Sequence, residues 1–174
     1  RSSCADSQRR ETAGGAAPML LTILKVAAIA ALVLAALPLA GLLANRPPLF
    51  DPPGFSRRMA VYLTTNVAET RDDSLFPELR PKQYAVPAGQ LFEQATTALE
   101  RLGWEIAERD AGNRRLRAVV STRLWKFRDD IAIEARVLPG ERSTLYVRSA
   151  SRVGRSDLAA NTRHILDLYV AMAS

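Results

Sequence analysis

The stretch of the sequence that decides the fold is IAIEARVLPGERSTLYV, residues 131–147. Apolar and polar residues alternate on both sides of the segment PGER at 139–142, and the apolar positions are Ile131, Ile133, Ala135, Val137, Leu145 and Val147. Such alternation places the apolar side chains on one face of a strand, and Pro-Gly is typical of a turn. The stretch therefore predicts an antiparallel hairpin with one buried face.

Two more strands are expected before this hairpin. Trp104 and Ile106 alternate with polar or small residues, DAGN at 110–113 indicates a turn, and alternation resumes over 115–120. Together with the hairpin, these segments predict four antiparallel strands.

Helical spacing of apolar residues appears on either side of the strands. Residues 88–102 predict one helix, which Gly103 ends. A C-terminal helix is indicated by Leu158, Ile165, Leu168, Tyr169 and Met172, with Ser156 as its N-cap and Asp157 in its first turn. We therefore expect an α+β fold: a four-stranded antiparallel sheet with two helices on one face, preceded by a single transmembrane helix.

The N-terminal quarter of the chain holds that apolar segment. Leu20 to Ala44 is apolar except for Thr22 and Lys25, and as a helix it is long enough to cross the hydrocarbon core of a bilayer. A cleaved signal peptide is the alternative, but no small-x-small cleavage site comes after the apolar run. We therefore predict an uncleaved anchor over 20–44. Residues 1–18 are predicted to be disordered or upstream read-through.

Two regions separate the anchor from the regular elements. Residues 45–63 include NRPPLFDPPG and predict a stiff, proline-rich spacer. Residues 64–87 show neither the helical nor the strand spacing of apolar residues, and they predict a loop with a short strand at 83–86. The globular α+β domain is expected over 64–174.

Positive charge around the anchor gives conflicting indications of its orientation. Lys25 lies near its start, whereas Arg46, Arg57 and Arg58 come after it. That distribution favours a cytoplasmic domain, but a short N-terminal signal-anchor more often exports the domain on its C-terminal side. We favour the periplasmic or extracytoplasmic side.

Composition limits the function classes. The net charge is +6, and no basic and aromatic ladder of the kind that binds single-stranded nucleic acid is present. Cys4 is the sole cysteine, so no thiolate metal site or internal disulfide can form. No phosphate-binding, dinucleotide or zinc-hydrolase motif occurs. The sequence predicts no nucleic-acid partner, cofactor, metal site or catalytic residue.

Charged side chains on the outer face of the hairpin are expected to pair. If residue 138 lies opposite residue 144, Glu134 faces Arg148 and Asp130 faces Arg152. A shift of two residues would make these pairs diagonal. These pairs give both arginines a structural explanation.

A basic corner lies between the last strand and the last helix. Arg152, Gly154, Arg155 and Ser156 could bind a phosphate or carboxylate at the helix N-terminus. Asp157 argues for an ordinary capped junction, because it already supplies the negative charge that a helix start favours. His164 has no partner recognisable from the sequence, and we expect a partly exposed structural histidine.

The segments TRLWKFRDDIAI at 122–133 and VRSASRVGRSDLAANTRHI at 147–165 resemble the signature of the domain of unknown function family 1499. TTNVAET at 64–70 and PELRP at 77–81 resemble its lead-in, so the resemblance covers about 64–173. Members are small bacterial and plastid proteins, often exported, lipid-anchored or membrane-attached, without an established activity. The resemblance implies that the motif positions, of unknown role, are Asp129, Asp130, Arg148, Ser149, Ser151, Arg152, Gly154, Asp157 and Asn161. A lead-in cysteine of many members is absent here, and Ala159 stands where glycine is usual.

Three functions compete. The first is a non-enzymatic, membrane-anchored binding or accessory module for a protein partner or an anionic envelope component, including anionic lipid. The second is a hydrolase or transferase acting on a phosphorylated or lipid-like substrate, with Asp130 as base and Arg152 or Arg155 as anion clamp; it requires a raised pKa at Asp130. The third is a structural subunit or assembly factor of a membrane complex.

Overall fold

The computed structural model describes residues 4–122, 124 and 126–174. They divide into two compact units, of which the first ends at Ala40 and the second runs from Gly41 to Ser174. Residues 1–3 of the predicted disordered segment, and Arg123 and Trp125 of the family signature, lie outside the described residues.

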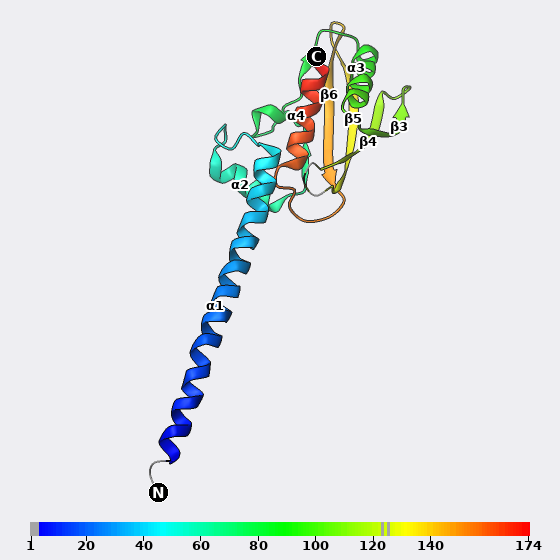
Figure 1. Cartoon of the computed structure of the whole chain (residues 1–174). Coiled ribbons are helices and arrows are strands. Elements are labelled where there is room, and N and C mark those ends of the chain that lie inside the picture. Colours follow the sequence, from blue (N-terminus) through cyan, green and yellow to red (C-terminus); the bar gives the residue numbers. More distant parts are fainter. Residues whose placement is uncertain (1–3, 123, 125) are drawn as a thin grey trace. The chain divides into compact units, whose positions relative to one another are not determined.

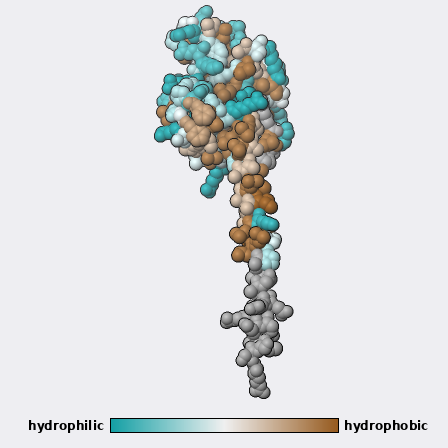
Figure 2. Space-filling view, turned by 60° about the vertical axis from the view of Figure 1, so that its left-hand side comes forward, coloured by the Kyte–Doolittle hydropathy of each residue, from teal (hydrophilic) through white to brown (hydrophobic). Residues whose placement is uncertain are grey.

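The first unit is helical. Helix α1 runs from Cys4 to Asn45, so its backbone includes residues 4–18, for which the sequence predicts disorder. Within the described part of the chain, its segment Pro18–Asn45 is the one helix long and apolar enough to cross a membrane. Figure 2 shows hydrophobic side chains along most of the helix that is drawn in colour.

The second unit is an α+β fold built on an antiparallel sheet (Figure 1). The sheet has the order β1-β6-β5-β4-β3, with β2 also paired to β6. Its strands are β1 (Val67–Glu69), β2 (Gln83–Tyr84), β3 (Glu105–Asp110), β4 (Arg115–Ser121), β5 (Arg128–Leu138) and β6 (Arg142–Ser151). Its helices are α2 (Phe55–Thr64), the short 3-10 helix η1 (Pro77–Leu79), α3 (Ala88–Arg101) and α4 (Ala160–Met172).

The α+β class, the antiparallel sheet and the apolar N-terminal helix are confirmed, but the sheet has six strands rather than four. The two additional strands, β1 and β2, come from the segment 64–87 and both pair with the outer edge of β6. Strand β2 lies within the short strand predicted at 83–86, whereas β1, with three residues, is too short for alternation to be visible in the sequence. All but the last residue of helix α2 lie in 45–63, where the sequence predicts a spacer, and Arg58 and Tyr62 on it are buried.

The core lies between one face of the sheet and helices α3 and α4. Helix α3 ends where Gly103, with φ 66°, adopts a left-handed conformation that glycine reaches without strain. The alternation of the predicted hairpin holds at five of its six apolar positions, which are almost fully buried: Ile131, Ile133, Ala135, Leu145 and Val147. Val137, beside the β5–β6 turn, was also expected on the buried face but is exposed. The opposite face of the sheet is open.

The β5–β6 turn is tighter than expected. Leu138 pairs with Arg142, so the loop has three residues, 139–141, and the register differs by two from the one expected. Gly140 and Glu141 take φ values of 75° and 55°, which close the loop. Because the shift is an even number of residues, the buried and open faces are unchanged.

The last turn of α1 packs within the second unit. Leu42 is buried, and Asn45 Nδ2 donates a hydrogen bond to the carbonyl oxygen of Leu158 at 2.9 Å. A Cβ atom at Gly41 would lie 2.5 Å from Leu158 Cδ1, so glycine permits this close approach. The globular unit therefore begins directly where the first unit ends.

Candidate functional site

The signature segment connects β6 to α4 through a buried polar network. Asn161 is completely buried; its Nδ2 donates to the carbonyl oxygen of Asn66 at 2.8 Å and to Ser151 Oγ at 2.9 Å. Ser149 Oγ donates to Asn161 Oδ1. One side chain thus joins α4 to β6 and to the residue that precedes β1, and three residues at motif positions have a structural role.

Asp157, rather than Ser156, caps α4. Its carboxylate oxygens accept hydrogen bonds from the backbone N–H groups of Ala159 and Asn161 at 2.9 and 3.0 Å. Burial raises the pKa of Asp157, although these hydrogen bonds act in the opposite direction. The predicted Ser156 cap is wrong: Ser156 Oγ donates instead to the carbonyl oxygen of Tyr62 at 2.8 Å.

The start of α4 also differs from the expectation, because the helix begins at Ala160. Leu158 and Ala159 have φ values of 51° and 69°, which are left-handed and cannot belong to a right-handed helix. At Ala159 the backbone takes a left-handed conformation that glycine adopts more readily.

The residues of the tentative anion site are largely engaged by other contacts. Arg152 is paired with Asp130, Ser156 with Tyr62, and the carbonyl oxygen of Gly154 accepts a hydrogen bond from Asn66 Nδ2 at 2.7 Å. Arg155 is exposed. Binding of an anion at this connection therefore stays a prediction.

His164 is buried rather than partly exposed. Its Nε2 lies 3.0 Å from Asp129 Oδ2, and Asp129 is completely buried. The ring of Trp104 meets the His164 ring edge-on at a centroid distance of 5.7 Å. Asp129 Oδ1 has no hydrogen-bond partner among the described residues. The pair ties α4 to β5 beneath the sheet.

Of the two predicted acid–arginine pairs on the open face, one is confirmed. Arg152 Nη2 lies 2.7 Å from Asp130 Oδ1, on the diagonal that the observed register creates. This arginine lowers the pKa of Asp130, which is the opposite of what a general base requires. The Glu134–Arg148 pair is wrong, because Glu134 pairs instead with Arg136 and Arg115, and Arg148 lies nearest to Glu69.

Replacing Arg152 with alanine is expected to raise the pKa of Asp130 toward its ordinary value. A carboxylate whose folded-state pKa is lowered stabilises the fold above its unfolded pKa, and this contribution disappears as the pH falls through the folded pKa. In Arg152→Ala, the free energy of unfolding should therefore depend less on pH in the acidic range where Asp130 titrates. Carboxyl ¹³C NMR titration of Asp130 measures the effect, with Arg155→Ala as the control. An unchanged Asp130 titration in Arg152→Ala would contradict the pairing.

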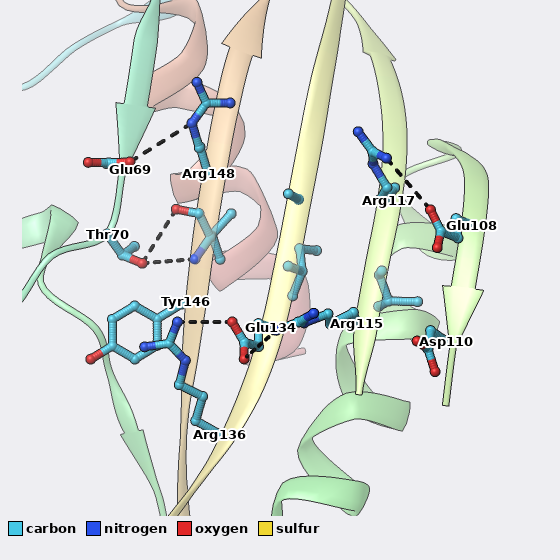
Figure 3. Close-up of a pocket in the computed structure, with 14 residues that line it drawn as sticks. Glu69, Thr70, Glu108, Asp110, Arg115, Arg117, Glu134, Arg136, Tyr146 and Arg148 are labelled. Carbon is cyan, nitrogen blue, oxygen red and sulfur yellow. Dashed lines mark hydrogen bonds and ion pairs between the residues drawn. The ribbon is translucent and has the colours of Figure 1, made fainter. Parts of the chain in front are cut away.

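The open face of the sheet contains a hollow of about 500 Å³ (Figure 3). Arg117 on β4 and Arg148 on β6 both lie opposite Ala132 on β5, so the two arginines flank one small, exposed residue. Neighbouring strands are about 4.8 Å apart, which puts the two arginine Cα atoms roughly 10 Å from each other. This row lines one end of the hollow, which extends along the sheet to Glu134 and Arg136.

Among the described residues, the acidic partners of the two flanking arginines are distant. Arg117 Nη1 lies 3.8 Å from Glu108 Oε2, and Arg148 Nε lies 3.9 Å from Glu69 Oε2, both beyond hydrogen-bond distance. The side chains of Arg117 and Arg148 are 70% and 53% exposed.

The carboxylate of Glu134, on the next row of the open face, is more fully neutralised. Glu134 is 2.9 Å from Arg136 and 3.5 Å from Arg115, and Arg136 lies over the Tyr146 ring. The pKa of Glu134 is lowered, chiefly by its hydrogen bond from Arg136. Figure 3 shows Glu134 held in this way, with Arg117 and Arg148 rising on either side of β5.

Sequence reasoning missed the Asp129–His164 pair, although one signal was available. Asp129 occupies an inward position of β5, in step with Ile131 and Ile133. An acid on the buried face of a strand requires a buried partner. Arg117 and Ala132 were missed as parts of a site, because only the strand register places them in one row.

The protein matches a family described as a protein of unknown function, DUF1499, over residues 46–172. The match begins before α2 and includes nearly all of the globular unit, whereas the resemblance in the sequence was recognised only from residue 64. No curated protein matches the chain at a significant level.

Proposed function

This chain belongs to the DUF1499 family, and from that premise we propose that it is a membrane-anchored, non-enzymatic binding domain that recognises an anionic group of its partner on the open face of the sheet. The partner is a protein or an anionic component of the envelope. Helix α1 supplies the anchor. An extracytoplasmic location of the domain stays a prediction.

The observation that carries this proposal is the row Arg117–Ala132–Arg148. Both guanidinium groups keep hydrogen-bond donors unused by their distant acidic partners, and the small side chain between them leaves room for a ligand group. A guanidinium binds carboxylate or phosphate through paired N–H groups. Because the lining also includes acids such as Glu69 and Glu108, the partner should carry its negative charge locally and be polar elsewhere.

Two observations favour binding over catalysis. The lowered pKa of Asp130 disfavours its use as the base of a hydrolase or transferase. The motif residues Ser149 and Ser151 are each hydrogen-bonded to Asn161, in a network that joins β6 to α4. A role as a subunit or assembly factor of a membrane complex remains compatible with the same binding face, and the partner would then be a protein.

We expect inorganic phosphate to stabilise the full chain in an uncharged detergent, with ionic strength held constant by chloride. A ligand at 100 times its dissociation constant adds about 2.7 kcal/mol to the free energy of unfolding. The double variant Arg117→Gln/Arg148→Gln should lose the resulting rise in melting temperature. Circular dichroism of the strand and helix signal measures the melt.

The control is Arg57→Gln/Arg101→Gln, which removes two exposed arginines outside the hollow and should keep the shift. Retention of the shift in Arg117→Gln/Arg148→Gln, or its loss in Arg155→Ala, would place the anion elsewhere and contradict the proposal. The absence of any shift with phosphate would also contradict recognition of a simple anion on this face.

A further inference from the structure

Two aromatic side chains stand exposed on the segment directly after α1. Phe50 is 83% exposed and Phe55 is 49% exposed. Their rings stack on each other with centroids 5.8 Å apart and an angle of 18° between the planes. Exposed aromatic surface of this kind is costly in water, and a stacked pair presents it as one patch.

A buried arginine holds this segment in place. Arg58, which is completely buried, donates from Nε to the carbonyl oxygen of Asp51 at 2.9 Å and from Nη2 to that of Pro52 at 2.6 Å. These bonds fix the backbone between the two phenylalanines. The aromatic pair is therefore displayed by a supported loop.

The chain connects this patch closely to the apolar helix. Helix α1 ends at Asn45, and its last turn already packs within the globular unit. Phe50 comes five residues later, a reach of at most about 18 Å even for an extended chain.

Positive charge accompanies the aromatic pair. Arg46 and Arg57, on either side of it in the sequence, are both exposed. Aromatic side chains concentrate at the interface between hydrocarbon and water, and cationic side chains are attracted to anionic headgroups. The patch thus combines the two kinds of side chain that a lipid headgroup region accepts.

We infer that Phe50 and Phe55, with Arg46 and Arg57, rest in the headgroup region of the bilayer that α1 crosses, so that the globular unit is held against the membrane surface. This inference rests on the anchoring part of the proposed function and is independent of the open sheet face. The occupant is lipid rather than a protein, because the patch adjoins a segment apolar enough to cross the bilayer and lies within reach of its end.

The test uses the full chain in vesicles of phosphatidylcholine and phosphatidylglycerol, with acyl chains either unmodified or brominated next to the headgroup. Phe50→Trp places a fluorophore in the patch while keeping an aromatic ring. The parent protein measures the background from Trp104 and Trp125. We expect the added emission to shift to shorter wavelength and to lose most of its intensity in the brominated vesicles.

Val137→Trp is the matched control, since Val137 is 67% exposed and lies by the β5–β6 turn, at the other end of the sheet from the β6–α4 connection that Asn45 contacts (Figure 1). Its added emission should not be quenched. Insertion of each variant is checked by its resistance to extraction with alkaline carbonate. Unquenched Phe50→Trp emission in inserted protein would overturn the inference, as would equal quenching in Val137→Trp. Extraction of the protein would instead overturn the anchor itself.

Discussion

Arg58→Ala is expected to lower the free energy of unfolding of the globular unit by about 3–5 kcal/mol. Arg58 donates to Tyr62 Oη at 3.0 Å, to both carboxylate oxygens of Glu78, and to the two carbonyl groups of the loop before α2. Its guanidinium also lies over the Phe76 ring, 4.5 Å from the centroid. Alanine would leave these acceptors without a donor and open a cavity between α2 and η1.

Thermal unfolding of the full chain in a mild detergent measures this loss, which corresponds to roughly 10–20 °C in melting temperature for a unit of this size. Arg57→Ala is the control: it removes the same charge from the preceding residue, which is exposed, and should change stability by no more than about 0.5 kcal/mol. If both variants melt at the same temperature, the buried arginine does not stabilise the fold as described.

Asn161→Ala is expected to cost about 2–4 kcal/mol. The change removes both donors and the acceptor of a completely buried amide, and it leaves the Asn66 carbonyl, Ser151 Oγ and Ser149 Oγ short of a partner. Each of these groups is then held away from water without a compensating hydrogen bond. The connection between β6 and α4 should consequently loosen.

The same melt measures this effect, and amide hydrogen exchange at β6 and α4 locates it. Asn113→Ala is the matched control, because Asn113 is an exposed asparagine of the β3–β4 turn that bonds only locally to Asp110. Its substitution should cost less than about 1 kcal/mol. Equal losses in the two variants would show that the buried network contributes no more than a surface turn.

Together, these results would separate the signature of the family from its function. Asn161, Ser149, Ser151 and Asp157 form contacts that a fold needs between its last strand and its last helix. If their loss lowers stability while phosphate still raises the melting temperature, the motif maintains the scaffold and the open face carries recognition.

Local periodicity in the sequence was sufficient for much of the architecture. The apolar helix, α3 with its end at Gly103, and strands β3 to β6 are all predictable from spacing within a few residues. The Asp130–Arg152 pair was also predictable, because a two-residue error in register leaves both side chains on the same face.

Other features depend on contacts between distant parts of the chain. Strand β1 was not predicted, because its three residues are defined by pairing with the edge of β6. A strand was predicted at 83–86, but not that it pairs with the same edge as β2. Nothing in the pair Arg57–Arg58 shows which arginine is buried; α2 and Glu78 decide it. His164 pairs with Asp129, which lies 35 residues away in the sequence. Arg117 and Arg148 flank Ala132 only because of the strand register. Sequence periodicity thus determined which faces are buried, because burial depends on local spacing. Only the tertiary structure decided which polar groups meet, because their partners come from strands and helices far apart in the chain.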